Sequence, residues 1–328
     1  MNERSRSIEI GLNAAIVAVH DQQPLILALA GKDGEPDALP FGPFDPLAHR
    51  TLETGLRVRV AEQTALKLGY VEQLYTFGDR GRHAMPGDVG PHVLSVGYLA
   101  LTQESQESAA ALARAGATWR QWYDFFPWED WRGSRPGILD ETLLPALDRW
   151  VAGEAARRSP PRALGREERV RLAFATADAG AAWDEERVLD RYELLYEAGL
   201  VVEAARDGRS AADTALTRLT GEPMRFDHRR IVATAISRLR AKLKYRPVVF
   251  ELMDATFTLS ELQRTVEAIS GRHLHTQNFR RLVEGAALVE QTGAIAPGRR
   301  GRPAALFRFR RDVVKERPAL GLRLGTRA

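Results

Sequence analysis

A cluster of side chains suited to reading nucleic acid lies near the C-terminal end of the sequence. The run Thr-Gln-Asn-Phe-Arg-Arg at positions 276–281 places amide and guanidinium groups within about two helical turns. In a DNA major groove, Gln and Asn pair with the edge of adenine, and Arg pairs with guanine. We therefore predict that DNA is contacted by Thr276, Gln277, Asn278, Arg280 and Arg281.

A second basic group follows in a loop rich in Gly and Arg, where we single out Arg299, Arg300 and Arg302. A flexible basic loop can contact phosphates or enter a minor groove. Such a loop is a weak signal by itself, so the prediction depends on the elements around it.

The elements that would position both groups have the order of a winged helix. We predict a short helix over 247–254, a second helix from about 257 that Thr258 or Ser260 can cap, and a third helix from Thr276. Segments 288–291 and 305–309 alternate like the strands of a hairpin. The third helix would enter the major groove, and the basic loop would lie at the tip of the wing. The alternative is a winged helix that docks onto protein, which would leave its basic charge unexplained.

The charge of the chain is divided unevenly. The formal net charge of the 328 residues is +4, but residues 229–328 carry +13 and residues 1–228 carry −9. A basic C-terminal third is typical of a nucleic-acid-binding domain joined to another domain. The alternative is a solvated basic surface without a partner.

The N-terminal two thirds mix predicted strands and helices. We expect two strands within 7–30 with a turn at Asp-Gln-Gln-Pro, and further strands at 70–79 and 93–102. Helices are predicted at 49–68, 139–157, 166–176, 184–200 and 226–245, the last with Asp227 as its N-cap. This last helix would connect the two domains.

Residues 119–131 contain four of the six tryptophans. We favour a core or interface cluster here, because aromatic side chains bury large apolar areas. The alternative is an aromatic wall that stacks a base or a sugar.

Composition excludes several classes of protein. The chain has no Cys, which excludes disulfides, thiolate metal sites and a cysteine nucleophile. No apolar run approaches the length of a membrane-spanning helix, and the first residues lack the apolar segment of an export signal. We expect no membrane partner and a cytoplasmic location.

Two regions together resemble a known family. The segments FTLSELQRTVEAISGRHLHTQNFRRLV and GRRGRPAALFRF look like the winged-helix domain of the Nudix-related transcriptional regulators of NAD metabolism. The segments YVEQLYTFGD, LSVGYLALT and FDHRRIVATAISRLRAKLKY are similar to the Nudix-like half of the same regulators and its connecting helix. The resemblance implies an α+β chain, in which a Nudix-like α/β/α sandwich with a helical insertion precedes a winged helix-turn-helix.

The resemblance also allows a test for hydrolase chemistry. Nudix hydrolases carry the signature G-x5-E-x7-R-E-U-x-E-E-x-G-U, whose glutamates hold divalent metal that clamps a diphosphate. When its end is aligned on residues 62–66, Glu62 keeps one glutamate, and the other three glutamate positions hold Arg50, Arg59 and Gln63. One carboxylate cannot supply the charge of three, so we expect no metal, no catalytic residue and no hydrolysis by the usual mechanism. His228 is interpreted as a connecting contact, not as part of a catalytic dyad.

The same changes suit a sensor, because Arg can neutralise a diphosphate without metal. Candidate ligand contacts are Arg50 and Arg59, with Arg80 and Arg82 on the loop after YTFGD. The alternative for all four is a surface charge without a ligand.

The resulting prediction is a ligand-responsive transcriptional regulator, a repressor that needs no cofactor. Its domains would be a sensor over 1–228 with an insertion at about 133–218, a connecting helix over 229–245 and a winged helix over 246–328. Its partners would be double-stranded operator DNA, a nucleotide-like effector such as ADP-ribose, and a second copy of the chain, since paired half-sites need a two-fold protein. Two alternatives stay open: an active Nudix hydrolase with atypical metal ligands such as Glu53 and Glu62, and a nucleic-acid-binding adaptor whose Nudix half only mediates assembly.

Overall fold

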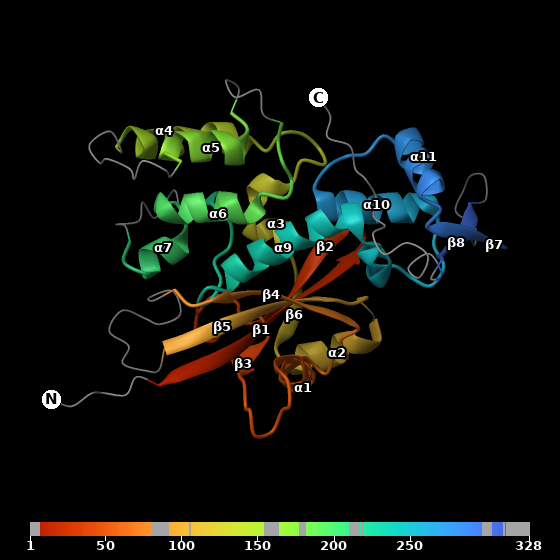
Figure 1. The fold of residues 1–328 in the computed structure, drawn as a ribbon, viewed down its shortest axis with the longest axis horizontal. Helices are drawn as coiled ribbons and strands as arrows, with labels where there is room; N and C mark the ends of the chain where they lie inside the picture. Colours follow the sequence, from red (N-terminus) through yellow and green to blue (C-terminus); the bar gives the residue numbers. More distant parts are fainter. Residues whose placement is uncertain are drawn as a thin grey trace.

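A mixed β-sheet between helical layers forms the body of the molecule, and a smaller helical domain with a two-stranded wing adjoins one end (Figure 1). The structure is a computed structural model that describes residues 7–79, 92–104, 106–153, 164–176, 182–209, 217, 219–296, 304–310 and 312. Among the described helices, none has the length and apolar character needed to cross a membrane.

The described part of the sheet has six strands in the order β4–β5–β1–β2–β6, with β3 paired to β1. The central strand β1 runs parallel to β5 and antiparallel to β2. It is buried from Gly11 to Ala18, because helices cover both faces of the sheet. Asp21 and Gln22 form the predicted turn with φ of 44° and 66°, a conformation that suits the twist of a hairpin. The strands are β1 (Ile8–His20), β2 (Gln23–Leu29), β3 (Phe41–Pro43), β4 (Tyr70–Phe77), β5 (His92–Leu101) and β6 (Ala117–Gln121).

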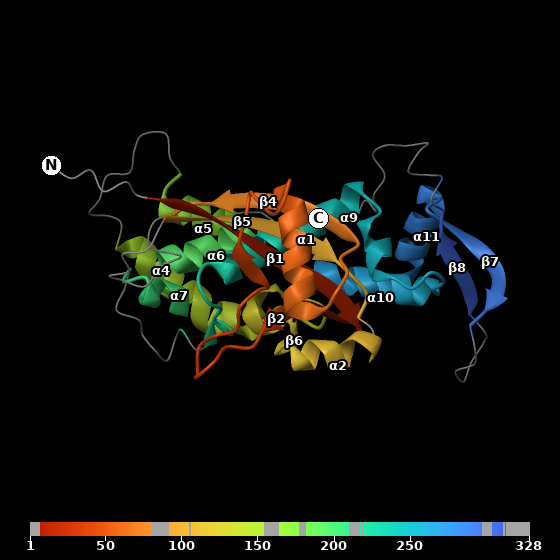
Figure 2. The same cartoon turned by 90° about the horizontal axis from the view of Figure 1, so that it is seen from below.

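Two helices cover one face of this sheet, α1 (Leu52–Thr64) and α2 (Gln106–Arg114) (Figure 2). The long helix α9 (His228–Tyr245) lies across the opposite face and contacts β1, β4 and β5. This sandwich confirms the predicted fold class. Strands β1, β2, β4 and β5 fall close to their predicted ranges because their apolar patterns are strong, whereas the short strands β3 and β6 were not predicted.

A further layer of helices packs on the outer side of α9, opposite the sheet (Figure 1). It begins with a π-helical turn at Leu139–Leu143. The helices that follow are α4 (Leu144–Ala152), α5 (Arg166–Phe174), α6 (Val188–Glu197) and α7 (Val202–Arg206). All of these except α7 fall in the stretches for which helices were predicted, and α7 was not predicted.

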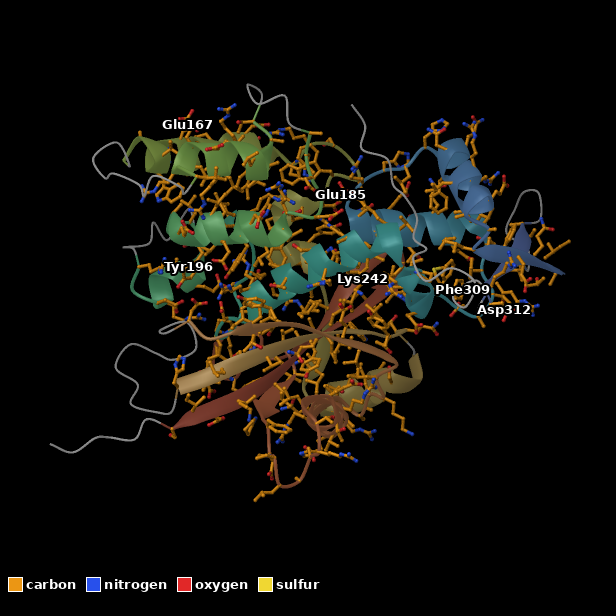
Figure 3. The ribbon with its side chains drawn as sticks, in the orientation of Figure 1. Glu167, Glu185, Tyr196, Lys242, Phe309 and Asp312 are labelled. Atoms are coloured by element: carbon orange, nitrogen blue, oxygen red, sulfur yellow. The ribbon has the colours of Figure 1, made fainter. Side chains whose placement is uncertain are left out.

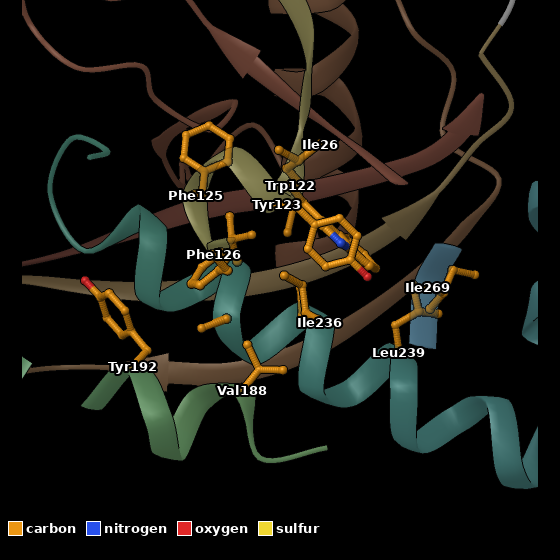
Figure 4. Packing of buried hydrophobic residues seen from close by; sticks show 14 of the residues in the cluster. Ile26, Trp122, Tyr123, Phe125, Phe126, Val188, Tyr192, Ile236, Leu239 and Ile269 are labelled. Atoms are coloured by element: carbon orange, nitrogen blue, oxygen red, sulfur yellow. The ribbon is translucent and has the colours of Figure 1, made fainter. Parts of the chain in front are cut away.

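The tryptophan-rich segment is core, as the favoured interpretation held. It contains β6, the short helix α3 (Trp122–Phe125) and a 3₁₀ turn at Pro127–Glu129. Trp122 and Trp128 are fully buried, and the segment packs between β2, α6 and α9 (Figure 4). A stacking wall open to a ligand is therefore not formed by these two rings.

Helix α9 shows both the strength and the limit of the sequence prediction. Its predicted apolar stripe is fully buried, with Ile231, Ala235 and Leu239 each at 0% exposure. Asp227 does stand at the N-cap position, but its side chain makes no capping hydrogen bond. Its carboxylate instead accepts from Arg230, so the predicted capping role is wrong.

The C-terminal module has the predicted order of elements. A 3₁₀ helix at Val248–Leu252 is followed by α10 (Leu259–Ser270), α11 (Thr276–Ala286) and the hairpin of β7 (Val289–Ile295) with β8 (Ala305–Phe309). Of the two predicted caps, Thr258 starts α10, where it forms a reciprocal capping box with Glu261.

Candidate DNA-binding face and effector site

The third helix of the winged module presents a polar face. Phe279 and Val283 of α11 are 2% and 0% exposed and hold the helix on the core. The predicted DNA contacts of α11 are all exposed: Thr276, Gln277, Asn278, Arg280 and Arg281. The structure thus brings the predicted amides and guanidinium groups together on one helix surface. The wing arginines Arg299, Arg300 and Arg302 lie outside the described residues.

The turn before α11 is fixed by one carboxylate. Glu267 accepts hydrogen bonds from the Leu274 N–H at 2.7 Å and from the Gln263 amide at 3.0 Å, and it pairs with His273 at 3.1 Å. The first turn of α11 contains no acidic residue. The positive end of its helix dipole is therefore not offset by a carboxylate in that turn.

The wing is attached to the module by a backbone pair and by ring stacking. Phe257 and Phe307 exchange two backbone hydrogen bonds of 2.9 and 2.8 Å. The rings of Phe250 and Phe309 stack with centroids 4.3 Å apart. These contacts hold the base of the wing beside α10.

A cavity of about 840 Å³ lies between the two modules, next to the start of α11. One wall consists of the β1–β2 turn and the loop that carries Asp130 and Arg132, and the other consists of α10 and Thr276. Burial alone would raise the pKa of Asp130, but the hydrogen bonds and charge of Arg132 outweigh it and hold that pKa below its ordinary value. Arg132 also donates to the Gln22 carbonyl at 2.5 Å, which fixes this wall.

The Nudix-like helix α1 does not arrange its carboxylates for metal. Glu53 pairs with Arg57 at 2.9 Å, and Glu62 pairs with Arg59 at 3.2 Å. Across the described residues, no group of three or more His, Asp or Glu side chains is placed to hold a metal ion. A metal that needs several carboxylates does not fit this helix.

Gln63 stands where the last glutamate of the signature would be and has a structural task instead. Its amide donates to the Phe41 carbonyl at 2.8 Å and its oxygen accepts from the Phe41 N–H at 3.0 Å. This two-point contact fixes β3 to α1. A glutamate could accept from the N–H but could not donate to the carbonyl.

Arg59 lies against β3 on the same side. A Cβ atom at Gly42 would stand 2.6 Å from the Arg59 Nε, so a larger residue there would require the Arg59 side chain to move. Its Nε is buried without a hydrogen-bond partner among the residues described. Arg50 is exposed before α1 begins, and roughly 10 Å of helix axis separates the start of α1 from Arg59. Arg80 and Arg82 lie outside the described residues.

An aromatic corner beside β3 was not predicted. The ring of Phe41 meets those of Phe226 and His228 edge to face, at 5.5 and 5.1 Å between centroids. His228 is fully buried and its Nδ1 accepts from the Leu39 N–H at 3.0 Å, so its interpretation as a connecting contact agrees with the structure. Phe226 has φ of 50°, which is rare for a bulky residue. No pattern in the sequence marks this corner, because Phe41 and Phe226 are far apart in the chain.

The basic charge of the C-terminal third serves two purposes. Among the residues that the structure describes, seven of its basic residues pair with carboxylates of the preceding 228 residues instead of facing DNA. They include two fully buried arginines, Arg229 with Glu203 at 3.2 Å and Arg240 with Glu129 at 2.7 Å. Others are Lys242 with Glu72, Lys244 with Glu186 and Arg272 with Glu185 (Glu185 and Lys242 are labelled in Figure 3). The charge difference between the modules is therefore partly a mutual attraction, and only the remainder is available to a polyanion.

Comparison with known proteins agrees with these features. A sequence model of the NrtR DNA-binding winged helix domain matches residues 249–309. The ADPR-responsive transcriptional repressor NtrR of Acinetobacter baylyi is 38% identical over 84 residues. That alignment covers 26% of this chain and 33% of the repressor, so the chain matches about a third of that relative.

Two solved structures share the fold of nearly the whole chain. Shewanella oneidensis NrtR, in a complex with a 27mer DNA, superposes with a TM-score of 0.54 at 21% identity, covering 96% of this chain and 98% of that one. A MutT/nudix family protein from Enterococcus faecalis gives a TM-score of 0.50 at 13% identity, covering 94% and 89%. The predicted resemblance is confirmed: residues 249–309 match the model of the NrtR winged-helix domain, and the chain shares its fold with solved NrtR and MutT/nudix structures.

Proposed function

We propose that the protein is a ligand-responsive transcriptional repressor that binds operator DNA through its winged helix. The observation that carries the proposal is the polar face of α11, exposed on a domain of the NrtR winged-helix family. The partial relative in Acinetobacter is named as an ADPR-responsive repressor. The chain would then comprise a sensor (1–228, insertion about 133–218), a connecting helix (229–245) and a winged helix (246–328).

DNA recognition would use the exposed residues of α11 for bases and the wing for phosphates. Gln277 and Asn278 suit the edge of adenine, while Arg280 and Arg281 suit guanine or a phosphate. The wing arginines Arg299, Arg300 and Arg302 would add contacts without sequence preference. Two subunits would bind paired half-sites as a homodimer, and with chromosomal DNA as its partner we expect the protein in the cytoplasm.

The effector would be a nucleoside diphosphate derivative such as ADP-ribose, bound at the Nudix-like module and not cleaved. Arg59, held against Gly42, would meet a phosphate, and Arg50, Arg80 and Arg82 are the other candidates. Hydrolysis through bound metal is disfavoured because Glu53 and Glu62 are each neutralised by an arginine of the same helix.

Three measurements test this function. DNA fragments selected from a random pool against the full chain should yield a preferred sequence, and ADP-ribose should change its affinity in a gel-shift titration. Calorimetry with ADP-ribose should give a binding signal of similar affinity with and without Mg²⁺. The absence of heat in both titrations would exclude this class of effector.

The hydrolase alternative makes a different prediction. Release of phosphate or a nucleoside monophosphate from nucleoside diphosphate sugars with Mg²⁺ or Mn²⁺ would favour it. An adaptor, in contrast, would bind DNA but no nucleotide metabolite.

A further inference from the structure

The last turn of α10 is completed by the other module. The final carbonyl groups of a helix have no partner within the helix and need donors from elsewhere. Here the Ala268 carbonyl accepts from the Tyr123 hydroxyl at 2.8 Å, and the Ile269 carbonyl accepts from the Arg240 Nε at 2.8 Å. The Gly271 carbonyl accepts from the Trp131 N–H at 2.7 Å. The three donors belong to the Trp-rich segment and to α9, so the helix that precedes the recognition helix is capped from outside its own domain.

Arg240 is the centre of this contact. Its side chain is fully buried, and its guanidinium also donates to the Glu129 carboxylate at 2.7 Å and to the Glu185 carbonyl at 3.0 Å. A positive charge at this end of α10 is favourable, because the C-terminus of a helix carries partial negative charge. Burial alone would lower the pKa of Arg240, but Tyr123 and Glu129 outweigh it and raise that pKa. The guanidinium therefore stays charged.

Gly271 leaves no space between the modules. It has φ of 71°, and a Cβ atom there would stand 2.4 Å from the Glu129 carbonyl oxygen. The same Cβ would stand 2.8 Å from the Arg240 Nη2 and 2.9 Å from the Tyr123 hydroxyl. The backbone of the turn that leads into α11 thus lies directly on the other module.

The outer helical layer also contacts the end of α10 and its partner Glu129. Glu129 is shared between Arg240 and Arg191 of α6, whose Nε lies 2.6 Å from it, and all three side chains are fully buried. Glu185, just before α6, pairs with Arg272 at 2.7 Å. The insertion therefore contacts the winged module as well as α9.

The other end of α9 reaches the candidate effector site. His228 and Phe226 meet Phe41, which is the residue of β3 that Gln63 fixes to α1. About 18 Å of continuous helix separates His228 from Arg240. One rigid element thus contacts both the effector module's β3 and the end of α10.

We propose that Tyr123, Glu129 and Arg240 form a positioning joint, which fixes the orientation of α10 and α11 on the sensor module and carries the coupling between effector and DNA. This inference rests on the proposed function. Contact with DNA or effector alone would not require the buried Tyr123 and Glu129 to bind Arg240, nor the insertion to contact the winged module. A positioning joint gives both features a role.

The orientation can be measured without any ligand. Because the chain has no Cys, spin labels can be placed at Ala61→Cys on α1 and Glu284→Cys on α11, both exposed, with labelled chains diluted by unlabelled ones. We expect a narrow distance distribution in the parent and a broader or shifted one in Arg240→Gln and Tyr123→Phe. Arg238→Gln is the matched control, since Arg238 lies on the same helix but is 48% exposed. An unchanged distribution in both joint variants would overturn the proposal.

The coupling is measured by DNA and effector titrations of the same full-length variants. We expect DNA affinity to fall about tenfold in Arg240→Gln and about threefold to tenfold in Tyr123→Phe, with ADP-ribose affinity in the absence of DNA unchanged. The factor by which ADP-ribose alters DNA affinity should shrink toward one, a readout that a purely structural role would not move. Tyr123→Phe keeps its ring in the core and decides the question should Arg240→Gln fail to fold.

The two levels of the proposal fail separately. If the parent binds neither DNA nor ADP-ribose, the proposed function is wrong, while the label distances still decide whether the joint exists. If the parent binds both and the joint variants keep its DNA affinity and its response to ADP-ribose within twofold, the coupling role is refuted.

Discussion

Replacing Gly271 by alanine tests the contact between the modules with the addition of one methyl group. The alanine would need a left-handed backbone at φ of 71°, which costs about 1–2 kcal/mol. Its Cβ would stand 2.4 Å from a backbone oxygen that cannot rotate away, and overpacking of this kind costs about 1–3 kcal/mol more. Displacement of the turn would also weaken the capping hydrogen bonds, at about 1 kcal/mol each. We expect a loss of about 4 kcal/mol in the free energy of unfolding.

This loss should lower the midpoint of thermal unfolding by about 10 °C, as measured by calorimetry or circular dichroism. Gly285→Ala is the control, because a Cβ there would meet nothing within 4 Å and alanine favours a helix over glycine by up to about 1 kcal/mol. Gly285→Ala should therefore leave the midpoint unchanged or raise it slightly. A Gly271→Ala protein that melts within about 2 °C of the parent would refute the close approach of α10 to Glu129.

Three further predictions concern separate parts of the molecule. Arg280→Ala and Arg281→Ala should each weaken operator binding about tenfold and lower the salt dependence of binding, with ADP-ribose affinity intact; equal gel shifts would contradict the assigned helix. Gln63→Glu should lower thermal stability, since a carboxylate cannot donate to β3, and should not create pyrophosphatase activity; a gain of Mg²⁺-dependent hydrolysis would contradict this. Burial alone would raise the pKa of Glu185, but the charges of Arg272 and Lys244 outweigh burial and hold that pKa below 4.5. The stabilisation that the Glu185 carboxylate provides is therefore complete above pH 4.5 and is lost as the pH falls through the lowered pKa. The free energy of unfolding of Glu185→Gln should therefore fall less between about pH 5 and the acid transition than that of the parent. Identical acid transitions of the two proteins would contradict this prediction.

The parts of the fold with strong local patterns could be predicted from the sequence. Helix α10 was predicted to start at a cap provided by Thr258 or Ser260, and Thr258 does cap it; α11 was predicted from Thr276, where it begins. These signals are local, so one segment contains all the information needed. The same holds for the exposed face of α11, which follows once its buried face is known.

The joint could not be predicted because its signals are distant in the chain. Periodicity places an arginine on the solvent side of a helix, yet Arg240 is buried because Glu129, 111 positions away, compensates its charge. Arg229 is buried in the same way, three helical turns earlier on the same face of α9, where it donates to the Phe125 carbonyl. The expected N-cap at Asp227 failed for a different, local reason, since Arg230, three residues along the same helix, binds its carboxylate.

The buried joint also limits how an effector could act. A ligand shifts the equilibrium between two conformations of a protein only by its difference in affinity for them. An effector bound near β3 must therefore favour a conformation whose DNA-binding helices are placed differently. A winged helix on a flexible tether would not transmit such a change, whereas α10 is capped by the same helix that meets Phe41. A displacement of α9 would move α10 and α11 with it and alter the spacing of two recognition helices in a dimer. Because coupling is reciprocal, operator DNA must then change the affinity for the effector by the same factor that the effector changes the affinity for DNA.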